Sequence, residues 1–126
     1  MNWILKLDHL QITIPTGMEN KAREFYSDIL GLREIEKPEI LKANGGLWYQ
    51  LNDLQLHLGT EAASGKSKRH PAFETTQIDK LLKHLKQHSV LIKEDQAIPG
   101  ITRFSCFDPF GNRIEFLEKH KQKNSD

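Results

Sequence analysis

Short runs in which hydrophobic and polar residues alternate make up most of this 126-residue chain. At 54–59 the sequence LQLHLG places three leucines on one side and Gln55 and His57 on the other. The stretch LKLDHLQITIP alternates in the same way. A period of two is typical of a β-strand with one buried and one polar face. The alternating runs predict strands at about 5–14, 32–36, 46–51, 54–59, 69–75, 90–95, 101–107 and 112–118.

Two longer segments have apolar residues at helical spacing instead. MENKAREFYSDILG at 18–31 carries Ala22, Phe25, Tyr26, Ile29 and Leu30 on one side and ends on a glycine. QIDKLLKHLKQHS at 77–89 has four apolar residues on one face. Both patterns predict amphipathic helices packed against a sheet.

In chain order these elements form the series β-α-β-β-β twice, with a period near 60 residues. The repeat predicts one α+β domain made of two modules, at about 3–60 and 69–118, joined by a small polar linker at 61–68 and followed by a polar tail at 119–126. Neither half would bury much apolar surface alone. We therefore expect the modules to pack together, with helices outside and sheets curved around a shared space. A ferredoxin-like or other α+β domain without a cavity is the alternative.

Superimposing the two modules groups four possible metal ligands. DHLQITIP matches RHPAFETT, so His9 corresponds to His70. LQLHLG matches RIEFLE loosely, which brings His57 or a neighbour near Glu115. The spacing from the first-strand histidine is 48 residues to His57 and 45 residues to Glu115. Each half then supplies one candidate from its first strand and one from its last.

Imidazole nitrogen and carboxylate oxygen are common ligands of Zn²⁺, Ni²⁺, Co²⁺, Fe²⁺ and Mn²⁺. A buried Glu115 would be costly without a cation or hydrogen-bond donors, and a divalent metal provides such a partner. The four positions therefore predict a divalent metal site. The competing interpretation is that each histidine is a surface residue or is satisfied by an ordinary hydrogen bond.

Composition and charge exclude several function classes. The net charge of +1 argues against a nucleic-acid-binding protein. The single cysteine, Cys106, is typical of a reducing compartment and of a buried, inert thiol. The first residues do not resemble a signal peptide, and no apolar run is long enough for a membrane span. We therefore expect a cytoplasmic protein whose partner is a small molecule.

Further candidates surround the predicted site. Arg103, in PGITRF, is a candidate for pairing with a substrate carboxylate or phosphonate, with a surface salt bridge as the alternative. Trp48 and Tyr49 must point to opposite faces, and Trp48 is the one predicted to line a pocket. Phe104 belongs either to that pocket or to the core. His84 and His88 are expected to face solvent, because leucines define the buried side of their helix.

Several segments resemble the vicinal oxygen chelate superfamily, which includes glyoxalase I, fosfomycin-resistance proteins, extradiol dioxygenases and bleomycin-binding proteins. The resemblance covers about residues 3–118, and its carriers are LDHLQI, AREFYSDILGL, LQLHLG, RHPAFET and DPFGNRIEFLE. Within the superfamily the chain is most similar to small bacterial glyoxalase-like proteins.

This resemblance implies paired βαβββ modules that form a curved open barrel around a divalent metal, and it implies His9, His70 and Glu115 as ligands. The fourth family position is a Glu or Gln in the isomerases and epimerases and falls at or beside His57. That histidine could be a ligand, a general base or an orienting hydrogen bonder. Glu74 is a further carboxylate that could face the cavity. Thr13 replaces an arginine of many glutathione-dependent glyoxalases, which argues against glutathione as cofactor.

Taken together, these features predict a homodimeric, metal-dependent lyase or isomerase that acts on a small oxygenated metabolite or electrophile. Glu115 and His57 are its predicted catalytic residues. Thiol addition and ring-cleaving dioxygenation are alternative reactions within the superfamily. The alternative from another class is a metal-free protein that sequesters an antibiotic or metabolite.

Overall fold

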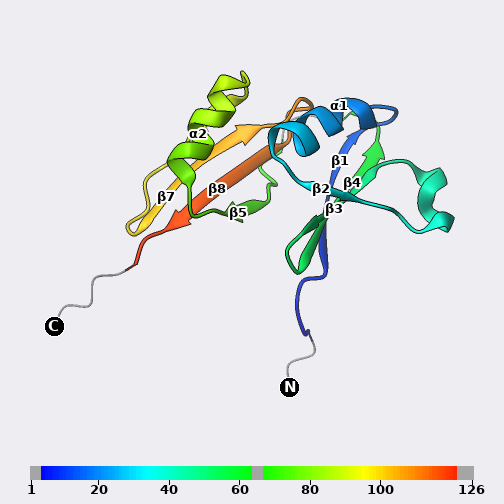
Figure 1. Cartoon of the computed structure of the whole chain (residues 1–126), viewed down its shortest axis with the longest axis horizontal. Coiled ribbons are helices and arrows are strands. Elements are labelled where there is room, and N and C mark those ends of the chain that lie inside the picture. Colours follow the sequence, from blue (N-terminus) through cyan, green and yellow to red (C-terminus); the bar gives the residue numbers. More distant parts are fainter. Residues whose placement is uncertain (1–3, 64–66, 122–126) are drawn as a thin grey trace. The chain divides into compact units, whose positions relative to one another are not determined.

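A computed structural model describes residues 4–63 and 67–121 of the chain. It divides into two compact units, Met1–Gly65 and Lys66–Asp126. Each unit contains one four-stranded mixed sheet that is not closed into a barrel (Figure 1). Each also follows the order β-α-β-β-β, apart from one additional short helix. The predicted α+β class and the βαβββ repeat are confirmed.

The first unit consists of β1 (His9–Pro15), α1 (Glu19–Arg23), η1 (Glu24–Ile29), β2 (Arg33–Ile35), η2 (Glu39–Asn44), β3 (Leu47–Leu51) and β4 (Leu54–Glu61). Its strands lie in the order β1-β4-β3-β2. The β1 strand is parallel to β4, whereas the other neighbours are antiparallel. This order places the first and last strands of the unit side by side.

The second unit repeats this arrangement with β5 (Ala72–Glu74), α2 (Ile78–Gln87), β6 (Leu91–Glu94), β7 (Ile101–Phe107) and β8 (Arg113–Lys119). Its strand order is β5-β8-β7-β6, and β5 is parallel to β8. The α2 helix lies along β7 and β8 in Figure 1. A carboxylate oxygen of Glu118 accepts the backbone N–H of Ile78 at 3.0 Å, which stabilises the beginning of α2.

The predicted helix at 18–31 is present, but its second half is wider than an α-helix. The α1 helix continues directly into η1, a π-helical turn in which the N–H of Leu30 bonds the carbonyl of Phe25 at 2.9 Å. This turn directs Phe25 and Tyr26 into the core. The Ser27 hydroxyl hydrogen-bonds the Tyr49 hydroxyl at 2.8 Å, so the helix and β3 are also joined by a polar contact.

Each unit has its own hydrophobic core between its helix and one face of its sheet. The buried residues of the first unit are Ile14, Ala22, Phe25, Tyr26, Leu47, Tyr49, Leu56 and Leu58. Those of the second unit are Ile78, Leu85, Phe104, Cys106, Ile114 and Phe116. The alternation predicted for LQLHLG is therefore observed, because its second and third leucines are buried in this core.

Two predicted strands begin three or four residues later than expected. The β1 strand begins at His9, which is aligned with Gln55, and the Asp8 carbonyl before it accepts the N–H of Gln55 at 3.3 Å. The β5 strand begins at Ala72, so His70 precedes the strand. Pro71 has no N–H to donate, although its carbonyl accepts the N–H of Glu115 at 3.0 Å. The η2 helix was not predicted.

The strand registers show how the two sheets correspond. Gln11, two residues after His9, is aligned with His57. Ala72, two residues after His70, is aligned with Glu115. His57 itself, and not a neighbour, thus occupies in its own sheet the place that Glu115 occupies in the other sheet. The local geometry of each unit can therefore be compared residue by residue.

Candidate functional site

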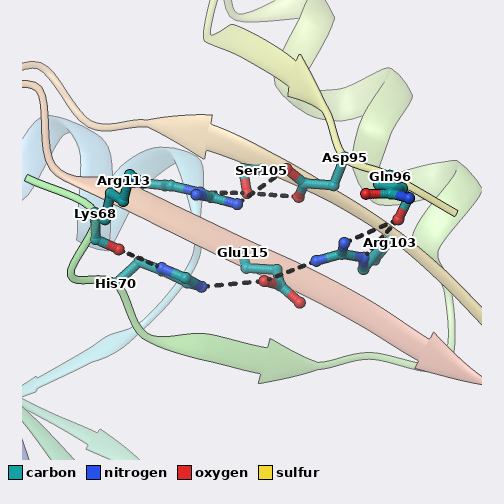
Figure 2. Close-up of polar contacts among 8 residues, drawn as sticks. All are labelled: Lys68, His70, Asp95, Gln96, Arg103, Ser105, Arg113 and Glu115. Atoms are coloured by element: carbon teal, nitrogen blue, oxygen red, sulfur yellow. Dashed lines mark hydrogen bonds and ion pairs between the residues drawn. The ribbon is translucent and has the colours of Figure 1, made fainter. Parts of the chain in front are cut away.

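Polar side chains from two strands, β7 and β8, and from two loops gather on the face of the second sheet opposite its core. Glu115 on β8 is aligned with Ser105 on β7, and both lie on this face. Arg103 and Arg113 lie on the same face by the two-residue alternation of strands. Figure 2 shows these side chains in two neighbouring rows of contacts. The alternation that buries Ile114 and Phe116 thus also creates this polar surface.

The first row centres on the Glu115 carboxylate, whose side chain is only 9% exposed. One oxygen, Oε1, lies 3.1 Å from Nε2 of His70 and 3.4 Å from Nη1 of Arg103. Arg103 also donates from Nε and Nη2 to the carbonyl of Gln96, at 3.0 and 2.8 Å. The guanidinium balances the buried charge and is fixed in place (Figure 2).

The second row consists of residues that sequence reasoning missed. The Asp95 side chain, 3% exposed, accepts from the Ser105 hydroxyl at 2.7 Å and from Arg113 at 3.0 Å. Arg113 also donates to the Ser105 oxygen at 3.0 Å. Asp95 and Arg113 are 18 residues apart, and no local pattern in the sequence indicates this contact. The row attaches the segment after β6 to the sheet beside Glu115.

In the first unit the corresponding place holds a stack of three aromatic rings. The His57 ring lies between Trp48, with centroids 3.9 Å apart and planes at 7°, and His9, with centroids 4.1 Å apart and planes at 16°. The Nε2–H of His57 donates to the Gln55 side-chain oxygen at 2.9 Å. His57 is 5% exposed. Both faces and one edge of the imidazole are therefore covered.

Burial lowers the pKa of the His57 imidazole below its usual value. The neighbouring His9 lowers this pKa further, Asp8 raises it, and Lys37 lowers it. His57 is therefore uncharged at pH 7. A neutral ring packed between two others is suited to orienting a ligand or forming a pocket wall. It is less suited than an exposed imidazole to binding a metal.

His9 and His70 have a different environment, and it fits a metal-binding role. Nδ1 of His70 lies 2.8 Å from the carbonyl of Lys68, and Nδ1 of His9 lies 2.9 Å from the carboxylate of Asp8. Both partners accept hydrogen bonds, so Nδ1 carries the hydrogen and Nε2 has the lone pair in the neutral ring. Metal-ligating histidines are typically oriented in this way.

The His70–Glu115 contact indicates the same chemistry. With its hydrogen on Nδ1, a neutral His70 directs a lone pair at Glu115 Oε1, which also carries lone pairs. Such a contact is favourable only if a proton or a cation lies on Nε2. The pair is therefore suited to hold a divalent metal. Within residues 4–63 and 67–121, no group of three or more His, Cys, Asp or Glu side chains is close enough to bind one.

The first unit also contains a pocket of about 590 Å³, a size typical of small-molecule sites. Its lining comes from β1, β3, β4 and the segment between β2 and β3, and comprises Asp8, His9, Gln11, Lys37, Leu41, Asn44, Gly45, Trp48, Gln55, His57, Leu58, Gly59 and Thr60. Trp48 thus lies at the pocket and Tyr49 is buried beneath η1. Lys37 was not among the predicted residues, because a lone lysine between turns has no recognisable pattern.

The remaining predicted residues lie outside these clusters. Phe104 is buried against Phe116, with ring centroids 5.6 Å apart, on the face of the sheet opposite Glu115. It therefore belongs to the core. Glu74 is aligned with Leu117 and forms an exposed ion pair with Lys119 at 3.5 Å. His88 is exposed directly after α2, and its Nδ1 donates to the carbonyl of His84 at 2.9 Å.

The most specific sequence motif, DPFGN, has a structural role. Asp108 is 4% exposed, and its Oδ1 accepts the N–H groups of Phe110 and Asn112 at 2.9 and 2.8 Å. Its Oδ2 accepts from the Asn112 side chain at 2.8 Å. The carboxylate therefore closes the turn between β7 and β8. This turn sets the register in which Ser105 meets Glu115.

Comparison with known families identifies the chain. Residues 6–116 match the model of the Glyoxalase/Bleomycin resistance protein/Dioxygenase superfamily. The chain belongs to this superfamily. Comparison with curated proteins gave no match.

Within the described residues, no helix has the length and apolar character required to cross a membrane.

Three solved structures are similar to this chain. A glyoxalase family protein from Bacillus anthracis is 42% identical, with a TM-score of 0.88, and the match covers 94% of this chain and 98% of that one. Lactoylglutathione lyase from Agrobacterium tumefaciens is 16% identical, with a TM-score of 0.75 and coverages of 93% and 96%. The antibiotic-binding protein TnmS3 from Streptomyces is 19% identical, with a TM-score of 0.72 and coverages of 94% and 99%. The last two likenesses show the fold alone.

Proposed function

We propose that this superfamily member is a divalent-metal-dependent lyase or isomerase that acts on a small oxygenated metabolite or electrophile. The observation that carries the proposal is the His70–Glu115 pair, in which Nε2 and Oε1 lie 3.1 Å apart while Nδ1 is held by the Lys68 carbonyl. His9, oriented by Asp8 in the equivalent way, is also proposed as a metal ligand. Zn²⁺, Ni²⁺, Co²⁺, Fe²⁺ and Mn²⁺ all accept this donor set.

The proposed roles of the protein groups follow from their contacts. When bound, the metal would polarise a substrate oxygen as a Lewis acid. Glu115 Oε1 is used by His70 and Arg103, whereas no described residue donates to Oε2, which can accept a proton from substrate. Arg103 holds the carboxylate in place and can also contact an anionic part of a substrate. His57, neutral and packed, orients the substrate instead of binding the metal.

Metal content tests the metal-binding part of the proposal. Protein produced without a polyhistidine tag and without chelator is expected to contain about one divalent ion per chain. His70→Ala and Glu115→Gln should each lower the metal content at least about tenfold, and His9→Ala should lower it as well. His88→Ala, which removes an exposed histidine directly after α2, is the matched control and should leave the metal content unchanged. Absence of stoichiometric metal, or equal content in all variants, would contradict the proposal.

Catalysis is tested separately by proton exchange. A lyase or isomerase that moves hydrogen between neighbouring carbons should catalyse exchange beside the carbonyl of a small α-hydroxycarbonyl compound in D₂O, measured by NMR. Glu115→Gln should lower the exchange rate at least about a hundredfold, because its amide is a very poor base. Exchange at the uncatalysed rate with metal-loaded protein, over a range of such compounds, would contradict lyase or isomerase activity.

One observation favours a second candidate, a metal-free protein that binds a small molecule. Arg103 already gives Glu115 a positive partner at 3.4 Å, so this buried carboxylate does not require a metal. The 590 Å³ pocket with Trp48 at its wall would serve such binding without any ligand set. TnmS3 shares the fold and is described as an antibiotic-binding protein. Metal-independent ligand binding together with absence of metal would support this candidate.

A further inference from the structure

The pocket of the first unit contains a lysine, Lys37, that forms no ion pair among the described residues. Lys37 is half-buried in the pocket lining, and its ammonium donates to the carbonyl of Gly45. Among the described residues no carboxylate forms an ion pair with it, whereas Lys42 on η2 is paired with both Glu36 and Glu39. A carbonyl positions an ammonium but does not neutralise it. The Lys37 charge is therefore available to a ligand.

The backbone that positions Lys37 is built from two adjacent glycines. Gly45 and Gly46 have φ of 74° and 88°, a conformation that other residues rarely adopt. A Cβ on Gly46 would lie 2.1 Å from the carbonyl oxygen of Leu58, so the segment is packed directly against β4. The Gly45 carbonyl that holds the ammonium thus belongs to a fixed part of the pocket wall.

Charges of opposite sign lie in different parts of the pocket. Asp8 lines the pocket and is paired with His9, whereas Lys37 lines it from the segment between β2 and β3 and donates to the Gly45 carbonyl. The structure shows no ion pair between Asp8 and Lys37 among the described residues. A bound molecule experiences a polarised site with its anion-binding part at Lys37.

The other residues of the pocket lining indicate the shape and polarity of the uncharged part of the ligand. Trp48 has one face on His57 and still lines the pocket, and Leu41 and Leu58 add apolar surface. Gln11, Asn44 and Thr60 contribute amide and hydroxyl groups. Flat unsaturated rings pack well on an indole. Asp8 is paired with His9, whereas the Lys37 ammonium is in no ion pair among the described residues, so the lining matches a ligand with one negative charge.

We propose that this pocket binds small monoanionic molecules with a flat, unsaturated body, and that Lys37 is the residue that binds their carboxylate or equivalent anionic group. The site lies wholly within the first unit and does not depend on metal. If the proposed lyase or isomerase activity is correct, the same chemistry defines its substrate class.

A matched pair of probes tests the proposal. 2-Naphthoate and 2-naphthamide have the same ring system and nearly the same size but differ in charge. Ligand-detected NMR titration of the full chain should give a Kd for naphthoate at least about tenfold below that for naphthamide. In Lys37→Met, which keeps the aliphatic stem, the two values should agree within about twofold. Lys37→Arg should keep the preference for the anion.

Lys42→Met is the control variant, because it removes a lysine of the same segment that is paired with carboxylates and does not line the pocket. It should retain the wild-type ratio. Each titration is repeated with EDTA, since a carboxylate could also bind a metal. An anion preference that survives Lys37→Met but disappears with EDTA would place the anion on a metal and overturn the proposal. Equal Kd values in the wild type, or no binding of either probe at about 10 mM, would also overturn it.

Discussion

The internal repeat groups four residues as possible metal ligands, but their side chains differ in which atoms are free to bind a ligand. The four are His9, His57, His70 and Glu115. His9 and His70 each have Nδ1 held by an oxygen acceptor, which leaves Nε2 for a metal. His57 is covered on both faces and bonded through Nε2. Glu115 has one oxygen occupied, and the other has no donor among the described residues. His57 and Glu115 occupy equivalent positions in their sheets, but only Glu115 has a free oxygen for chemistry. This difference cannot be predicted from the residue types alone.

Cys106 provides a prediction at the residue scale. The thiol is fully buried, and burial, together with the nearby Asp108, raises its pKa to about 12. Because the thiolate is the nucleophile, raising the pH from 7 to 9 does not activate this side chain in the folded protein. Native protein at pH 8 should react with a thiol reagent such as DTNB at least about a hundredfold more slowly than protein unfolded in guanidinium.

The reaction is followed by absorbance and by mass spectrometry of the labelled chain. The unfolded protein serves as its own control, since it should yield one thiol per chain. Rapid native labelling at the unfolded rate would show that Cys106 is accessible and ionisable, contrary to its position in the core.

Asp108 gives a second prediction at this scale. Asp108→Ala removes the acceptor of three hydrogen bonds in the turn between β7 and β8. We expect a loss of about 2–4 kcal/mol in the free energy of unfolding, measured by urea denaturation. Asp53→Ala, in the exposed turn between β3 and β4, is the matched control and should change stability by less than about 0.5 kcal/mol. Equal effects of the two substitutions would contradict a structural role for DPFGN.

At the scale of elements, the segment between η2 and β3 depends on its glycines. Gly46→Ala would place a methyl group 2.1 Å from the Leu58 carbonyl oxygen, which belongs to backbone and cannot move aside. We expect a loss of about 3 kcal/mol or more of unfolding free energy. Gly17 also has a positive φ, 83°, but nothing lies near its Cβ position, so Gly17→Ala should cost only about 1 kcal/mol. Urea denaturation of both variants gives the comparison.

The periodic patterns of the sequence predicted most of the strands and helices, because each pattern arises from residues close together in the chain. The β7 strand has the predicted bounds, 101–107, and α2 lies within the predicted helix at 77–89. The β5 strand is shorter because of Pro71 and its short pairing with β8. The η2 helix escaped prediction because six residues give too short a period to recognise. The sequence therefore predicted which site residues lie on the polar face of a strand. It could not predict the ring stacking on His57 or the Asp95–Arg113 contact, because both depend on segments that are distant in the sequence.

At the scale of the whole molecule, the open edges of the two sheets matter most. Within each sheet, and among the described residues, two strands are paired on one side only, namely β1 and β2 in the first unit and β5 and β6 in the second. Unpaired strand edges promote association. Leu5 and Leu7, 94% and 63% exposed, directly precede the edge strand β1. Large exposed apolar residues beside an edge are typical of an interaction surface.

We therefore predict a homodimer formed through residues 4–7 and the β1 edge. Light scattering at micromolar concentration should give twice the chain mass of 14.6 kDa. Leu5→Lys combined with Leu7→Lys should yield a folded monomer, because burying two ammonium groups in an apolar contact is costly. Leu91→Lys alters another exposed leucine, 68% exposed on the edge strand β6, and should leave the dimer intact. A monomeric wild type would contradict dimerisation, whereas dissociation by Leu91→Lys alone would place the interface at β6.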